Sequence, residues 1–547
     1  MDEQLKKEVS LSAKPEGSER STLDQTAQTG YYYANPDAFP KGSAAAAKVV
    51  ASVPVLRAAP VYPKRRAAGR DLILALLLLA ACFLLWDSLR WANGLGLGEA
   101  LGLTALLPIA LWYLGDRPGK LRGYGAICAG LYLIGALSLI FSGDAVLKAL
   151  LLLALPLLFV IVILERLELR TGNGLLNRLH DWFYTAFGMS FGRLKVGAWA
   201  LTHCGAEDTL RSKQTRAIGL GLLCAVPALF ILLPLLISSD AAFEGMLGSL
   251  DWSAAGRGAL ALLYGGFGAL LVFTLLFSSD RGPRPLENGT RRGLEPLGVA
   301  AFLGAVSAAY VLYLAAQFAY FTDAFRGLLP RDFTMAEYAR RGFFEMCGIV
   351  AINLGLIVIS LGLCRKEGGR VPKAVKSLSL FLCFFSLLLV ATALSKMLLY
   401  MGSFGLTRLR VLTSVFMVWL AVVVAAVGLR LFVKRMPVLK LAVTLGAAAL
   451  IALSLANVDG IVARYNVDAW RTGRLDGLDM STICELGDGS VPTLVELTRD
   501  GDPAVASKAR QELNRRKLTE DLRSWNLVEQ QALDALTEYR QNSDARR

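Results

Sequence analysis

The chain contains long apolar runs that are almost free of charge, and these runs constrain its fold more than any other feature. Crossing about 30 Å of hydrocarbon at about 1.5 Å per residue requires roughly 20 apolar residues in a helix. Backbone N–H and C=O groups cannot stay unpaired in lipid, so each such run must be helical. The sequence therefore predicts an all-α, polytopic transmembrane bundle of about 11 spans, at residues 72–86, 95–114, 123–142, 145–164, 217–238, 258–278, 297–321, 343–364, 377–400, 409–433 and 441–458.

Basic residues are unevenly distributed between the connecting loops, and this sets the predicted orientation. Cytoplasmic loops of membrane proteins are enriched in Lys and Arg. The loops after each even-numbered span carry 23 Lys and Arg, against 7 in the opposite loops. The N-terminus is therefore placed inside the cell, and eleven crossings place the C-terminal segment outside. Four basic residues just before the first span agree with this orientation: Lys64, Arg65, Arg66 and Arg70.

The chain divides into three regions of different composition. Residues 1–62 are polar and rich in alanine and proline, which predicts a disordered cytoplasmic tail. Residues 63–458 form the predicted transmembrane helical domain. Within it, the long cytoplasmic loop 165–216 contains an amphipathic stretch near 174–195, which indicates an interfacial helix.

The third region, residues 459–547, is charged and predicts a small extracytoplasmic helical domain. Residues 489–513 are similar to one HEAT-type helical hairpin built around a DGDP turn. A single hairpin cannot bury both of its faces, so we expect it to pack on the helices that follow.

The overall composition excludes an ordinary soluble enzyme. Hydrophobic residues make up 54% of the chain and charged residues only 19%, whereas a typical soluble domain has about 25% charged residues. Loop orientation explains the net charge of +14, so we expect membrane lipids as partners and no nucleic acid. With only His180 and His203 and no CxxC motif, we expect no metal and no cofactor.

Two glycine-containing patterns carry different weight. GMSFG (188–192) matches the G-x-S-x-G string, but no strand precedes it, so we interpret it as coincidence. Gly94, Gly98 and Gly102 are spaced four apart, which favours close packing of helices within the bundle.

The strongest candidate site is a cluster of cations on the predicted outer side. Five of the seven outer-loop cations lie in two neighbouring loops, and Arg410 follows just beyond the second loop. The first loop also carries Glu337 and Tyr338. The cations are Arg326, Arg331, Arg340, Arg341 and Arg408.

Two ionisable residues enter the membrane near this cluster. Glu345 lies about three residues inside the eighth span and Lys396 about four residues from the outer end of the ninth. Both are expected about 5 Å below the outer surface, where they are plausible partners.

The cation cluster has two interpretations. In the first, the acidic residues nearby neutralise the arginines in a structural network. In the second, the arginines bind an anionic envelope ligand or lipid headgroup through bidentate hydrogen bonds. Tyr338 would then line the rim of the site and Glu345 would supply the counter-charge.

Three classes of function follow from these features. The first is a non-enzymatic envelope sensor or binding protein. The second is a secondary transporter, which Pro156, Pro227 and Pro234 within apolar spans favour. The third is a membrane enzyme acting on lipid-linked phosphates, with Glu337 or Glu345 as general base.

Four blocks of sequence, in this order, resemble a bacterial membrane family: AQFAYF, FTMAEYARRGFFEM, SKMLLYMGSFGLTRLRVLTSVFMVWL and ARYNVDAWRTGRLDGLDMSTICELGDGSVPTLVEL. Over roughly residues 215–530 the chain resembles the domain of unknown function 4173 family, close to its sister 4153. The resemblance implies a shared fold and a plasma-membrane location, but no activity. It adds weight to the residues that fall on these blocks: Glu337, Tyr338, Arg340, Arg341, Glu345, Arg408 and Arg410.

Overall fold

The computed structural model describes ten segments of the chain, and each regular element in them is a helix. An isolated bridge joins Leu294 to Cys364. Contacts divide the chain into a unit of residues 1–64, which lies outside the described segments, and a unit of residues 65–547. The described segments are residues 66–91, 96–115, 121–168, 175–203, 252–281, 293–325, 343–366, 371–433, 436–516 and 522–544.

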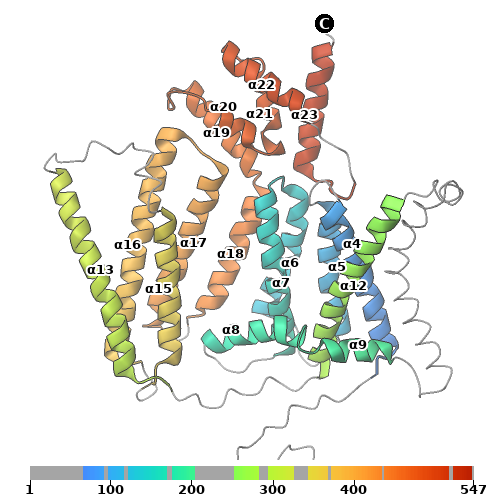
Figure 1. Ribbon diagram of the computed structural model, residues 1–547, viewed down its shortest axis with the longest axis vertical. Helices are drawn as coiled ribbons and strands as arrows, with labels where there is room; N and C mark the ends of the chain where they lie inside the picture. The colour runs from blue at the N-terminus through green and yellow to red at the C-terminus, as the bar shows by residue number, and fades with distance from the viewer. Residues whose placement is uncertain are drawn as a thin grey trace, which may run out of the picture. The chain divides into compact units, whose positions relative to one another are not determined.

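The described segments form the predicted apolar helices (Figure 1). A helix named α5 (Leu97–Tyr113) is apolar but has only 17 residues and contains Pro108. The predicted span at 217–238 lies outside the described segments. Within these segments, nine helices are long and apolar enough to cross a membrane: α4 (Gly69–Trp91), α6 (Tyr124–Ser138, continued by η2, Leu139–Phe141), α7 (Ala145–Leu167), α12 (Trp252–Arg281), α13 (Pro296–Phe325), α15 (Phe343–Leu363), α16 (Lys373–Phe404), α17 (Arg408–Arg430) and α18 (Val438–Leu455).

The helix α16 is longer than the sequence predicted. Its apolar run was expected to span residues 377–400, but the helix begins at Lys373 and continues to Phe404. Pro372 occupies the N-cap, and Gly405 ends the helix with a φ of 73°, a conformation that glycine adopts readily. The 32 residues of the helix give it a length of about 48 Å.

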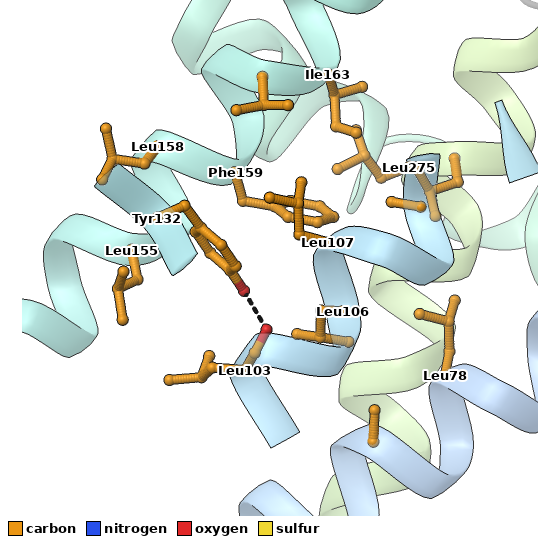
Figure 2. Packing of buried hydrophobic residues seen from close by; sticks show 14 of the residues in the cluster. Leu78, Leu103, Leu106, Leu107, Tyr132, Leu155, Leu158, Phe159, Ile163 and Leu275 are labelled. Carbon is orange, nitrogen blue, oxygen red and sulfur yellow. Dashed lines mark hydrogen bonds between the residues drawn. The ribbon is translucent and has the colours of Figure 1, made fainter. Parts of the chain in front are cut away.

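The first cluster of buried residues joins α4, α5, α6, α7 and α12. Tyr132 of α6 lies at its centre, 1% exposed, and its hydroxyl donates a hydrogen bond of 2.7 Å to the carbonyl of Leu103 in α5. Figure 2 shows this bond among leucines from α4, α5, α7 and α12, with Phe159 beside the tyrosine ring. A buried hydroxyl with an acceptor avoids the cost of an unpaired polar group.

The second cluster of buried residues joins α13, α15, α16 and α17. A polar group lies within it: the Tyr310 hydroxyl donates to Oδ1 of Asn353 at 2.7 Å, and Nδ2 of Asn353 donates to the Ser386 hydroxyl at 3.1 Å. These residues come from three helices, α13, α15 and α16, and Asn353 is fully buried. The polar group therefore links three helices across an apolar interior.

The helix α18 contacts both clusters. Ala447 and Ile451 belong to the first cluster and Val438 to the second. The indole Nε1 of Trp419 in α17 donates to the carbonyl of Ala442 at 2.9 Å. On the other side, the Ser454 hydroxyl donates to the carbonyl of Ser138 at 3.2 Å. One helix thus ties the two clusters together.

Short helices follow α7 at the end that carries the predicted cytoplasmic loop (Figure 1). They are α8 (Leu175–Phe183), the π-helix η3 (Tyr184–Met189) and α9 (Leu194–Thr202), where one helical stretch was predicted near 174–195. Phe183, Phe187 and Phe191 form a stacked, exposed row. Asp181 and Arg193 are instead buried against the protein. Polar residues inside and aromatic residues outside are the arrangement expected for a helix that faces lipid.

The C-terminal helices have a core of their own. As predicted, residues 489–513 contain a helical hairpin, whose second helix begins after Asp502 accepts hydrogen bonds from the backbone of Ala504 and Val505. Leu494 and Leu497 of the hairpin join a buried cluster with the last helix, which covers the face that one hairpin leaves open. The helices are α19 (Val458–Arg471), α20 (Met480–Glu485), η4 (Asp488–Ser490), α21 (Val491–Leu497), α22 (Pro503–Arg515) and α23 (Leu527–Asp544).

Candidate functional site

The structure describes four of the ten predicted site residues: Glu345, Lys396, Arg408 and Arg410. The predictions for the other six lie outside the described segments; they are Arg326, Arg331, Glu337, Tyr338, Arg340 and Arg341.

Glu345 and Lys396 lie on neighbouring helices at different distances from the helix ends. Glu345 is exposed in the first turn of α15, as predicted. Lys396 is half-buried in α16, which packs against α15. Because α16 continues to Phe404, Lys396 lies eight residues, about 12 Å, from the end of its helix. The predicted distance of four residues is wrong, since the helix does not end where its apolar run ends.

Arg408 forms ion pairs with two carboxylates from distant parts of the chain. Its Nε lies 2.8 Å from Oδ1 of Asp459 in α19 and 3.3 Å from Oδ2 of Asp144, just before α7. Both carboxylates are almost fully buried, and the arginine side chain is 27% exposed. We call these three residues the Arg408 clasp. The clasp joins the start of α17, the start of α7 and the start of α19.

Each carboxylate of the clasp also holds backbone groups. Asp144 caps α7, since its Oδ1 accepts hydrogen bonds from the N–H groups of Val146 and Leu147 at 2.7 and 3.2 Å. Oδ2 of Asp459 accepts the N–H of Gly487 at 2.9 Å. Burial raises the pKa of the Asp459 carboxyl above its ordinary value, and the guanidinium of Arg408 opposes this shift.

Arg410 binds the end of the preceding helix. Its Nη1 donates to the carbonyls of Phe404 and Gly405 at 3.2 and 2.6 Å, and its guanidinium lies 4.1 Å from the centroid of the Tyr400 ring. A cation at a helix C-terminus satisfies carbonyls that lack partners within the helix. Arg410 therefore closes the turn between α16 and α17.

An asparagine reinforces the same turn from the C-terminal helices. Oδ1 of Asn466 accepts the N–H of Leu406 at 2.7 Å, and its Nδ2 donates to the carbonyl of Leu406 at 2.8 Å. A Cβ added to Gly405 would lie 2.6 Å from this Oδ1. The positive φ and the close approach together require glycine at this position.

A second contact ties the last part of the chain to the first cluster. The N–H groups of Leu97 and Gly98, at the start of α5, donate to the carbonyls of Trp525 and Arg523 at 3.0 and 2.9 Å. The side chain of Arg523 forms an ion pair of 3.2 Å with Asp87. This segment is thus a further place where the C-terminal helices dock, besides the clasp and the contact of Asn466 with Leu406.

Within the described segments no group of three or more His, Cys, Asp or Glu side chains is arranged to hold a metal ion. The two described arginines of the predicted site, Arg408 and Arg410, donate to groups of the protein itself.

Sequence reasoning identified the arginines of this site and missed their partners. Asp144 lies in the two-residue loop 143–144, and Asp459 directly follows the last predicted span. A signal was present, because both carboxylates fall at predicted outer ends of spans, on the same side as Arg408. Asn466 carried no such signal, since its amide binds a backbone group.

The comparisons with known proteins place the chain in a family. No curated protein and no solved structure matched the chain. A family described as Domain of unknown function (DUF4153) matches residues 126–497, which run from α6 to α21. The matching family is therefore 4153 and not the 4173 family that the four sequence blocks resemble; both are described as domains of unknown function. The chain belongs to the DUF4153 family.

Proposed function

We propose that this protein is a non-enzymatic sensor or binding protein of the bacterial plasma membrane, spanning it eleven times. The Arg408 clasp is the observation that carries this proposal. A sensor must convert an event in its extracytoplasmic part into a change in its membrane helices. The clasp connects the C-terminal helices to α7 and α17 through buried charges, which resist displacement because each charge needs its partner.

The position of the C-terminal helices supports the proposed orientation. They contact the turn between α16 and α17 and the residue before α7, two loops that carry few basic residues. Lys373 and Lys440 lie at the opposite ends of α16 and α18. By the positive-inside rule, this distribution of basic residues supports an extracytoplasmic position for the C-terminal helices.

We propose an anion as the ligand. Arg408 and Arg410 bind groups of the protein near the turn between α16 and α17. We therefore assign ligand binding to the other predicted residues. Glu345 lies at the start of α15, directly after the segment that carries them. The cations of that segment lie outside the described residues, and the proposal for them rests on sequence: Arg326, Arg331, Arg340 and Arg341.

A thermal-shift experiment on the purified full chain tests this proposal. The probes are anionic envelope lipids and sugar phosphates, and the variants are Arg340→Ala/Arg341→Ala and, as a control, Arg410→Ala. A ligand at about 100 times its Kd stabilises the folded state by about 2.7 kcal/mol. We expect one class of anion to stabilise the wild type and Arg410→Ala but not the double variant. No shift with any anion, or an equal shift in the double variant, contradicts the anion site.

The coupling is tested separately by hydrogen exchange. In the wild type, the anion that gives the thermal shift should slow exchange at the starts of α7 and α17. In Arg408→Ala we expect binding to persist while this protection is lost. Protection that survives the loss of the clasp would show that the signal takes another route.

A secondary transporter is the second candidate, and one observation favours it. The polar group of Tyr310, Asn353 and Ser386 lies near the middle of α13, α15 and α16. Transporters bind their substrates near the midplane, where polar side chains are otherwise costly. Counterflow of labelled solutes in proteoliposomes tests this function. Flux that is lost in Asn353→Ala, in a protein that remains folded, would favour transport over sensing.

A further inference from the structure

An open apolar groove runs between α16 and α17, with a volume of about 650 Å³. Phe384 and Phe432 line it and expose 62% and 59% of their surface. Large aromatic side chains exposed to this extent on membrane helices face either lipid or a partner.

The floor of the groove is formed by small residues. Gly428 of α17 lies over Cys383 of α16, and a Cβ added at Gly428 would meet the Cys383 Cβ at 3.6 Å. This is ordinary van der Waals contact, so a Cβ fits here, and a larger side chain at residue 428 would take up part of the groove that Gly428 lines. The missing side chain at residue 428 therefore contributes to the recess.

The length of the groove matches one leaflet of a bilayer. Along α16 the lining residues extend from Ser377 to Leu387, ten residues apart and therefore about 15 Å in length. Half of a hydrocarbon core of about 30 Å is the same distance. The groove is thus about as long as a single acyl chain within one leaflet.

One end of the groove carries positive charge and the other does not. The Nζ of Lys376 lies 4.3 Å from the centroid of the Phe432 ring, which lines the groove. Lys373 is exposed one turn earlier in the same helix. At the other end, beside Leu387 and Val424, the lining is apolar. An amphiphile with one anionic end and one apolar chain is complementary to this pattern.

We propose that the groove is a binding site for an anionic phospholipid of the leaflet on the Lys376 side. One acyl chain lies in the groove over Gly428, and Lys376 pairs with the headgroup phosphate. Phe432 holds the lysine at the mouth of the groove. This site is separate from the Arg408 clasp, which lies at the other end of α16 and α17.

The test measures lipid association with the full chain in nanodiscs. Spin-labelled phosphatidylglycerol and phosphatidylcholine are compared in the wild type, Gly428→Leu and Lys376→Gln. The matched controls are Gly355→Leu, a helix position with open space around it, and Lys195→Gln, an exposed lysine on α9. A lysine close to an anionic lipid surface corresponds to about a fivefold preference in binding.

We expect the wild type to prefer phosphatidylglycerol about fivefold. Lys376→Gln should lose this preference and keep the immobilised lipid, whereas Gly428→Leu should lose the immobilised lipid itself. Both controls should behave as the wild type does. The proposal is overturned if neither lipid is preferred in the wild type, or if the preference survives in Lys376→Gln. An unchanged amount of immobilised lipid in Gly428→Leu overturns it too.

Discussion

Glycines in the two helix clusters include some that lie in very different surroundings. In the first cluster a Cβ added to Gly102 would lie 2.9 Å from the Ala81 carbonyl oxygen, and one added to Gly265 would lie 2.9 Å from the backbone of Cys82 and Phe83. In α13 and α15 of the second cluster, Gly304 and Gly355 have open space within 4 Å among the described residues. Gly102 and Gly265 thus let helix backbones come into contact, whereas Gly304 and Gly355 leave an open helix surface among the described residues.

Burial differs between individual helices of the two clusters. In α7 of the first cluster, 56% of the central apolar window is buried inside the protein, whereas in α13 of the second cluster the figure is 17%. The values for α4 of the first cluster and α16 of the second lie between these, at 28% and 44%. The helix α18 and the Arg408 clasp connect the second cluster to the first. Four predictions test how the clusters and the clasp contribute to stability.

Loss of the clasp should have the largest effect. We expect Arg408→Ala to lower the free energy of unfolding by about 3 kcal/mol, because it leaves the buried carboxylates of Asp144 and Asp459 unpaired. The matched variant Arg410→Ala removes hydrogen bonds to two carbonyls and should cost about 1 kcal/mol. Denaturant unfolding in micelles measures both. An equal loss of unfolding free energy in the two variants would show that the ion pairs of Arg408 stabilise the protein no more than the hydrogen bonds of Arg410 do.

Replacing a glycine by leucine should have the next largest effect on stability, and the effect should differ between the two clusters. Gly102→Leu forces apart the backbones of α4 and α5 and should cost about 1–3 kcal/mol. Gly304→Leu meets open space and should change stability by less than about 0.5 kcal/mol. Thermal unfolding of the two variants provides the comparison. A large loss in Gly304→Leu would mean that another surface covers this face of α13.

Removing one hydroxyl in each cluster should have a smaller effect. Tyr132→Phe leaves the carbonyl of Leu103 without its side-chain donor in a fully buried site and should cost about 1 kcal/mol. Tyr310→Phe should cost about 0.6 kcal/mol, the average for polar contacts between membrane helices. Both are measured by unfolding. Lost solute flux in Tyr310→Phe without lost stability would instead support the transporter.

The smallest effect concerns pH. The raised pKa of Asp459 means that the folded protein retains this proton at a pH where the unfolded chain has released it. This group therefore favours the folded state at low pH, and its contribution falls as pH rises through the folded pKa. Above the pH range in which aspartate ordinarily titrates, we expect the free energy of unfolding to depend less on pH in Asp459→Asn than in the wild type. The free energy of unfolding measured across pH tests this, and an identical slope in the variant contradicts it.

The sequence predicted the helices well because lipid imposes a simple rule. An apolar run of about 20 residues has few alternatives to a membrane helix. The glycine spacing was also informative: it predicted close packing within the bundle, and Gly98 and Gly102 lie against α4, while Gly94 lies outside the described segments. Helix ends were predicted less well: α16 continues past its apolar run, because a helix stops only where its backbone conformation changes, here at Gly405.

The candidate site was predicted only in part, for a physical reason. Arg408 and Arg410 were recognised as unusual cations, but the carboxylates that bind Arg408 lie elsewhere in the chain. Nothing in local spacing pairs Arg408 with Asp144, which stands before α7, since tertiary packing alone brings them together. The amide of Asn466 binds a backbone group of Leu406, and backbone groups have no sequence signature.

The length of α16 has a further consequence for how the protein fits its membrane. Lys376 and Lys396 lie twenty residues apart in this helix, a rise of about 30 Å. A typical bilayer has a hydrocarbon core of about the same thickness, so we expect each ammonium to reach a different layer of headgroups. On this expectation the turns of α16 beyond Lys396 extend past the acyl chains. In a thinner bilayer this helix would have to tilt, or the bilayer around it would have to thicken locally.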